Sequence, residues 1–315
     1  MDDRIRQFRY LAVLATVATY FLIFVGGLVR VSGAGLGCPD WPKCFGRWIP
    51  PTHVSQLPPE MDPALFNFTL AWIEYINRLI GVLVGLVIVI AAVYALIHLR
   101  KYPRLLIPTI LAALLTAFQG WQGSQVVSSH LSPALVSVHM ATAFLIVSLL
   151  AYASVRTYLP EIDPPGKTTT PIRLTGWTGL FWIIVIIQVI LGTFLRATVE
   201  YTAGRLPLLT PGEWLHRTGL IAYIHSFIGI LIGIAWMALF VRLRPFLASL
   251  SYIKQIIPAI FGLVIIQILF GLLLFALGNP PLIQLLHLWT AALLAGLILV
   301  LHVILKHYDR IVYAG

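Results

Sequence analysis

Hydrophobic residues recur in eight long runs along the 315-residue chain, and shorter polar segments separate these runs. Each run reaches the length of about 20 residues that an α-helix needs to cross a lipid bilayer. Proline, glycine or charged residues stand at most of the junctions, where helices end. We therefore predict transmembrane helices at residues 9–30, 72–98, 105–127, 133–156, 175–198, 219–241, 255–277 and 282–305.

Composition supports an all-α integral membrane protein, because 59% of the residues are hydrophobic and only 10% are charged. A soluble protein cannot bury that much apolar surface. The formal charge of +10 does not indicate a nucleic-acid partner, because the basic residues gather in the loops on one side of the predicted helices. That side is predicted to be cytoplasmic and to carry both termini, in the cell (plasma) membrane. Its basic residues include Arg4, Arg6, Arg9, Arg100, Lys101, Arg104, Arg156, Lys167, Arg173, Arg242, Arg244, Lys254, Lys306 and Arg310.

The second half of the chain repeats the pattern of the first half. At one constant offset, residues 72–81 align with 220–229, Gln119 with Gln267, and His139 with His287. Residues 26–30 align with 192–196 at a longer offset, because the first outer loop is longer than its counterpart. The pattern predicts two tandem four-helix-bundle repeats of one orientation, at residues 1–160 and 161–315.

Three glutamines lie inside predicted spans, at Gln119, Gln188 and Gln267. Polar amides inside a membrane commonly form hydrogen bonds between neighbouring helices. We expect that role for all three residues.

Three of the nine histidines also lie inside predicted spans, each about six residues, or about 9 Å, from the outer end of its helix. They are His139, His225 and His287. Ionisable groups are expensive in lipid and indicate function. His225 and His287 belong to one repeat, so they are predicted to hold both axial positions of a heme iron. The alternative is that both imidazoles form hydrogen bonds with neighbouring helices.

The corresponding site in the first repeat contains His139, but Asn77 stands where a second histidine is expected. Asparagine is a poor iron ligand, and an open coordination position suits catalysis better than electron transfer. Glu74, the only carboxylate well inside a predicted span, lies one turn earlier and is expected on the same helix face as Asn77. Either Glu74 is catalytic, or it forms a salt bridge with Arg78 or Arg30.

Arg30 and Arg196 occupy matching positions at outer helix ends. Both are candidates to pair with heme propionates, or to anchor the helices at the membrane interface. Cys38 and Cys44, the only cysteines, lie in the predicted outer loop, where an oxidising compartment favours a disulfide. This pair is either a structural staple or a redox-active pair.

The loop at residues 33–46, with its Gly-Cys-Pro-Asp-Trp-Pro-Lys-Cys run, closely resembles the first outer loop of heme A synthases. That family's Glu-x-x-His-Arg motif appears at 74–78, and its histidines in the fourth, sixth and eighth helices match His139, His225 and His287. The resemblance implies an enzyme that oxidises the C8 methyl group of heme O to a formyl group for cytochrome oxidase assembly.

The same resemblance implies that His225 and His287 hold a heme b cofactor. It places the heme O substrate near Glu74, Arg78 and His139. Asn77 departs from the family pattern and excludes bis-histidine ligation of the substrate heme.

Three hypotheses follow. The first is a heme A synthase, with heme O synthase, cytochrome oxidase assembly factors and a second copy of the chain as candidate partners. The second is a non-catalytic membrane protein that holds heme b for electron transfer or heme handling. The third is a transporter, which the scarcity of charges inside the predicted spans argues against.

Overall fold

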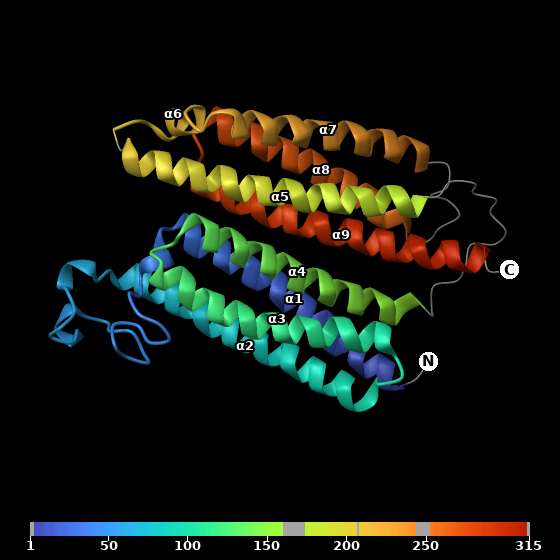
Figure 1. Ribbon diagram of the computed structural model, residues 1–315, viewed down its shortest axis with the longest axis horizontal. Helices are drawn as coiled ribbons and strands as arrows, with labels where there is room; N and C mark the ends of the chain where they lie inside the picture. The colour runs from blue at the N-terminus through green and yellow to red at the C-terminus, as the bar shows by residue number, and fades with distance from the viewer. Residues whose placement is uncertain (1–2, 160–173, 207, 244–252, 314–315) are drawn as a thin grey trace.

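The computed structural model describes residues 3–159, 174–206, 208–243 and 253–313. These residues form helices joined by loops, and among them there is no strand beyond one isolated bridge between Cys44 and Arg47. Eight helices are long and apolar enough to cross a membrane, which confirms the predicted all-α membrane architecture (Figure 1). They are α1 (Asp3–Val31), α2 (Phe68–His98), α3 (Pro103–Ser128), α4 (Pro133–Tyr158), α5 (Leu174–Arg205), α7 (Leu220–Leu243), α8 (Ile253–Ala276) and α9 (Pro281–Tyr313).

The remaining helical segments lie in the connections. The short helix α6 (Pro211–His216) precedes α7, and three 3-10 turns, Ala34–Leu36, Val54–Gln56 and Pro63–Leu65, lie in the long loop between α1 and α2.

Local sequence explains where several helices begin. Pro103, Pro133 and Pro281 each open a helix, at a position where the missing N–H group costs no hydrogen bond. Asn67 precedes α2, and its side chain accepts a hydrogen bond from the Leu70 amide at 3.1 Å. The principal differences from prediction are extensions beyond the apolar runs, because a helix can continue after it leaves the lipid.

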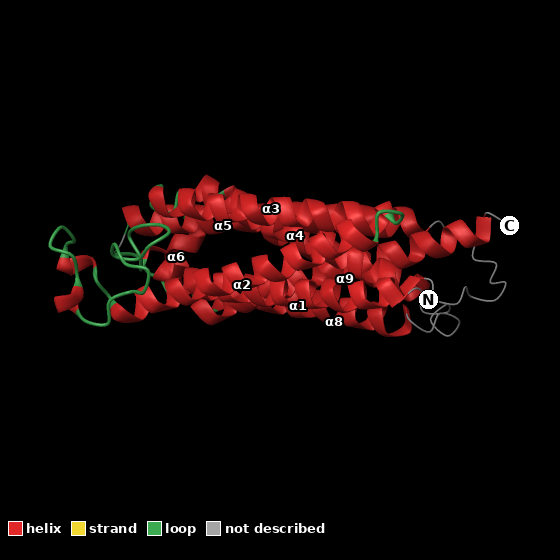
Figure 2. Cartoon of the chain, turned by 90° about the horizontal axis from the view of Figure 1, so that it is seen from below, coloured by secondary structure: helices red, strands yellow, loops and turns green. Residues whose placement is uncertain are grey.

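The long helices form two groups of four that lie side by side, α1–α4 in one and α5, α7, α8 and α9 in the other (Figure 1). Figure 2 shows that their axes run roughly along the long dimension of the molecule. The N- and C-terminal ends lie at the end of the bundle opposite the α1–α2 loop. The placement of that end in the cytoplasm and the division of the chain at residue 160 stay predictions. Lys167, Arg173 and Arg244 lie outside the described residues.

Helix α9 is the central helix, and it packs against α8, α5, α4 and α1. In its most apolar window 61% of the residues are buried, compared with 11% for α7 and α8. The outer helices therefore present large apolar faces to their surroundings, as lipid-exposed helices do.

A cluster of Ile23, Phe144, Val147 and Ala292 joins α1 and α4 of the first group to α9 of the second. Nearby, a side chain at Gly296 would overlap the Tyr20 hydroxyl, so this glycine permits close approach of α9 to α1.

Candidate functional site

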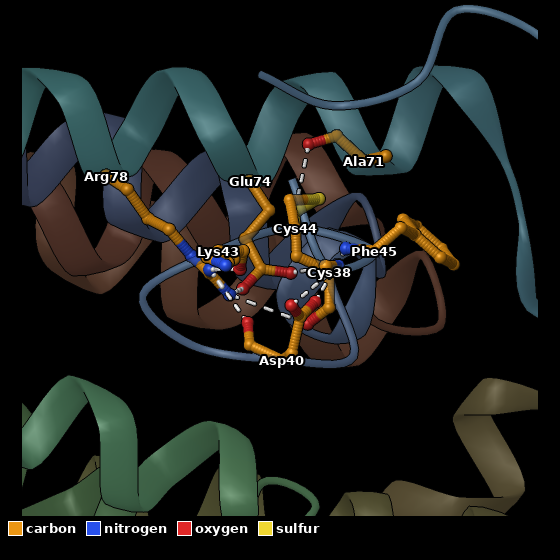
Figure 3. The surroundings of a disulfide bond; sticks show 9 residues. Cys38, Asp40, Lys43, Cys44, Phe45, Ala71, Glu74 and Arg78 are labelled. Carbon is orange, nitrogen blue, oxygen red and sulfur yellow. Dashed lines mark hydrogen bonds and ion pairs between the residues drawn. A yellow bond between two sulfur atoms is a disulfide. The ribbon is translucent and has the colours of Figure 1, made fainter. Parts of the chain in front are cut away.

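Glu74 lies in the second turn of α2 and is only 4% exposed. Its carboxylate is directed toward the α1–α2 loop (Figure 3). Oε2 accepts a hydrogen bond from the Cys38 amide at 2.8 Å, and Oε1 accepts one from the Arg78 guanidinium at 2.5 Å. The expected salt-bridge alternative with Arg78 is therefore present, and Arg30 does not take that place. A buried carboxylate fixed in this way can stabilise positive charge without reorganising.

Arg78, one turn after Glu74, holds the loop as well as the carboxylate. Its guanidinium donates to the backbone carbonyl oxygens of Asp40 at 2.9 Å and Lys43 at 2.8 Å. The Asp40 side chain closes the same loop by accepting hydrogen bonds from the amides of Phe45 at 2.6 Å and Gly46 at 2.8 Å. Sequence reasoning missed Asp40, because its role depends on the fold of the loop. Together these bonds fix the loop over the first turns of α2.

Cys38 and Cys44 form a disulfide, as predicted, and both cysteines are completely buried. The cross-link closes the segment that contacts Glu74 (Figure 3). Gly37 lies directly against α2, and a Cβ atom at this position would overlap the backbone of Leu70. The short approach of loop to helix therefore requires glycine here.

Asn77 faces α1 rather than the loop. Its Oδ1 atom lies 4.0 Å from the position that a Cβ atom would take at Gly26, and this buried oxygen has no hydrogen-bond partner among the described residues. The functional atoms of Glu74 and Asn77 thus have different neighbours, although the two residues are less than one turn apart. The orphaned oxygen leaves a polar group available at the position where the second histidine was expected.

His225 on α7 and His287 on α9 come together, with ring centroids 6.3 Å apart and planes at 70°. Two imidazoles on opposite sides of one metal ion, each about 2 Å from it, have ring centres roughly 6 Å apart. The Nδ1 atoms of both rings are buried and have no hydrogen-bond partner among the described residues. The spacing and the free ring nitrogens fit two axial ligands of a single heme iron.

His139 lies at the matching depth of α4, six residues after its first residue Pro133. Its Nδ1 atom is likewise buried and unpartnered within the described chain. No group of three or more His, Cys, Asp or Glu side chains among the described residues is arranged to hold a metal ion by itself.

Arg30 and Arg196 converge on a carboxylate that sequence reasoning missed, Glu200. Arg30 binds it at 3.1 Å from α1, and Arg196 binds it at 2.7 Å from within α5. Glu200 lies beyond the predicted span at residues 175–198, but helix α5 continues past that span and the apolar segment of the helix extends to Ala203. The spacing of four residues from Arg196 was the available signal. The cluster bridges the two helix groups and retains an excess positive charge.

Comparison with known proteins gives a consistent result. The profile of the cytochrome oxidase assembly protein family, COX15-CtaA, matches residues 9–299. A heme A synthase of Shewanella oneidensis is 29% identical over 68% of this chain and 64% of its own length, so the match spans just under two thirds of that relative.

Two further relatives are matched along more of their length. A heme A synthase from the Wolbachia of Brugia malayi is 24% identical over 90% of this chain and 92% of its own. A heme A synthase from Shouchella clausii is 26% identical over 76% of this chain and 77% of its own length. The matched regions include both helix groups.

Proposed function

Because the chain belongs to the cytochrome oxidase assembly protein family, we propose that it is a heme A synthase, a multi-pass membrane enzyme that oxidises the C8 methyl group of heme O to a formyl group. The observation that carries the proposal is the buried carboxylate of Glu74, fixed between the disulfide loop and Arg78 at the same end of the bundle as His139.

The second helix group is the proposed site of a heme b cofactor, which His225 and His287 would hold. A heme iron held firmly by two protein ligands would supply electron transfer rather than substrate binding. The separation of 6.3 Å between the ring centroids supports this assignment. Arg196 is proposed to bind a heme propionate while it keeps its ion pair with Glu200, because a guanidinium has five N–H donors.

The first helix group is the proposed substrate site, with His139 as the ligand of the heme O iron and Asn77 on the neighbouring α2. Conversion of a methyl group and water into a formyl group releases four electrons and four protons, so the reaction requires an external oxidant that accepts four electrons in total. The Glu74 carboxylate is proposed to stabilise positive charge that develops at the methyl carbon. Arg78 holds that carboxylate and the loop in place and thereby orients it.

A second candidate function is a membrane protein that holds heme b without oxidising heme O. Asn77 favours this candidate, since it replaces the histidine that the family motif has at this position. The salt bridge of Glu74 with Arg78 also gives that carboxylate a purely structural role. The two candidates differ in their product and not in their cofactor.

Expression in a bacterial host that makes heme O but has no heme A synthase tests the proposal. Hemes extracted from the membranes are separated by chromatography and identified by mass. An enzyme yields heme A together with protein-bound heme b, whereas a heme-holding protein yields heme b and leaves heme O unchanged. The plasma membrane location, the cytoplasmic termini and contact with heme O synthase remain parts of the proposal.

A further inference from the structure

Each of the three membrane histidines receives the same hydrogen bond from a neighbouring helix. The Nε2 amide of Gln119 donates to the backbone oxygen of His139 at 3.0 Å. Gln188 donates to that of His225 at 2.5 Å, and Gln267 to that of His287 at 2.8 Å. The donors lie on α3, α5 and α8, so three different helix pairs use one arrangement.

A glycine four residues after each of these glutamines faces the imidazole ring. A Cβ atom at Gly192 would lie 3.0 Å from Cε1 of His225, and one at Gly123 or Gly271 would lie 3.9 Å from the same atom of its histidine. Residues four apart lie on one helix face, so the amide contacts the backbone and the glycine faces the ring. In each Gln-x-x-x-Gly segment, the glutamine therefore fixes the position of the histidine backbone along the neighbouring helix, and the glycine leaves room for the imidazole ring.

The fourth helix pair lacks both partners. The position on α1 that corresponds to Gln188 is Leu22, and Asn77 on α2 stands in place of the histidine. The glycine persists as Gly26, which still faces Asn77. Leu22 instead packs in an apolar cluster of the first helix group. Three helix pairs therefore have both the glutamine and the histidine, and the fourth pair has neither. This pattern is expected if the glutamine positions the histidine, and not if it only joins two helices.

We infer that Gln119, Gln188 and Gln267 are positioning residues for heme-ligating histidines. This inference rests on the proposed function, because it takes the histidines to be iron ligands. It also predicts what the fourth pair needs to hold a second ligand, namely an amide at residue 22 as well as a histidine at residue 77.

The first test replaces the glutamines beside the proposed heme b ligands, in the variants Gln188→Leu and Gln267→Leu. Leucine is chosen because Leu22 occupies the corresponding position on α1. The matched control is Gln284→Leu, because Gln284 on α9 donates its amide to Asn279 and not to a histidine. Each protein is purified with its heme. We then measure the rate at which heme transfers to an apoprotein scavenger, and the low-spin ferric absorption spectrum.

We expect heme loss to become roughly 10–100-fold faster in both histidine-linked variants, with a loss of the six-coordinate low-spin signature. The control is expected to stay within about twofold of wild type under the same principle. Wild-type rates and spectra in both variants would overturn the inference. A wild-type protein without heme would instead contradict the proposed function.

The second test adds a histidine to the first helix group, so its result does not depend on whether the protein folds after loss of a glutamine. Asn77→His alone is compared with the double variant Leu22→Gln/Asn77→His by titration with hemin. The double variant is expected to give more six-coordinate low-spin heme and slower release than the single variant. Equal binding by both would contradict a positioning role for the amide.

Discussion

Replacement of Glu74 separates its chemical role from its structural role. Glu74→Gln keeps the shape of the side chain and one oxygen that can accept the Cys38 N–H group, but it removes the charge. Arg78 then keeps the carbonyl oxygens of Asp40 and Lys43 as partners. A hydrogen bond to a charged group exceeds a neutral one by about 1 kcal/mol, so we expect a modest loss of stability.

Both replacements take the counter-charge from the Arg78 guanidinium, whose side chain is 15% exposed, and Glu74→Ala in addition removes both hydrogen bonds. Removing one partner of a buried ion pair costs about 3–5 kcal/mol, and an amide that keeps one hydrogen bond recovers part of that loss. We therefore expect Glu74→Ala to reduce the amount of folded protein more than Glu74→Gln does. If the carboxylate stabilises charge during oxidation, its neutralisation is expected to lower the rate by about 100-fold or more.

The assay is the ratio of heme A to heme O in extracted membranes, normalised to the amount of this protein. Glu74→Gln is expected to be folded, to hold heme b and to make almost no heme A. A near wild-type ratio in Glu74→Gln, combined with loss of protein in Glu74→Ala, would refute the catalytic role and leave Glu74 as a support of the loop.

Four other features of the structure give further predictions. Gly37→Ala is expected to displace the loop from α2 and to lower heme A output, which extraction of membrane hemes measures. Cys38→Ser with Cys44→Ser is expected to destabilise the loop by about 2 kcal/mol, seen as faster proteolysis in the loop, since the disulfide closes a short segment. Glu200→Gln is expected to change the free energy of unfolding by less than about 1 kcal/mol, because its side chain is 41% exposed. His287→Ala is expected to lose the heme b spectrum while the protein still folds, and retention of that spectrum would contradict its role as ligand.

The length of the apolar runs predicted the long helices, because lipid imposes one length and one polarity on every crossing segment. The ends were less predictable. Residues 199–205 of α5 are polar enough to end an apolar run, yet the helix continues through them. Glu200 was missed for this reason, although its spacing from Arg196 is that of a helical ion pair.

The constant offset between the two halves of the sequence predicted that His139 and His287 lie at equal distances from the ends of their helices. The structure places each of them six residues after the first residue of its helix. The repeat did not predict the contacts between the α1–α2 loop and α2. The roles of Asp40 and of the loop carbonyls depend on a turn that hydrogen bonds within the loop and from Arg78 on α2 hold together. Long-range contacts of this kind leave no periodic signal in a sequence.

The most direct test of the central claim is the spectrum of an a-type cytochrome oxidase in a strain that lacks its own heme A synthase. Membranes are compared with and without this chain by reduced-minus-oxidised difference spectroscopy. Our account predicts that the heme a absorption band returns with the wild-type chain and stays absent with Glu74→Gln. Only b- and o-type bands with the wild-type chain, with the protein present and carrying heme, would contradict it.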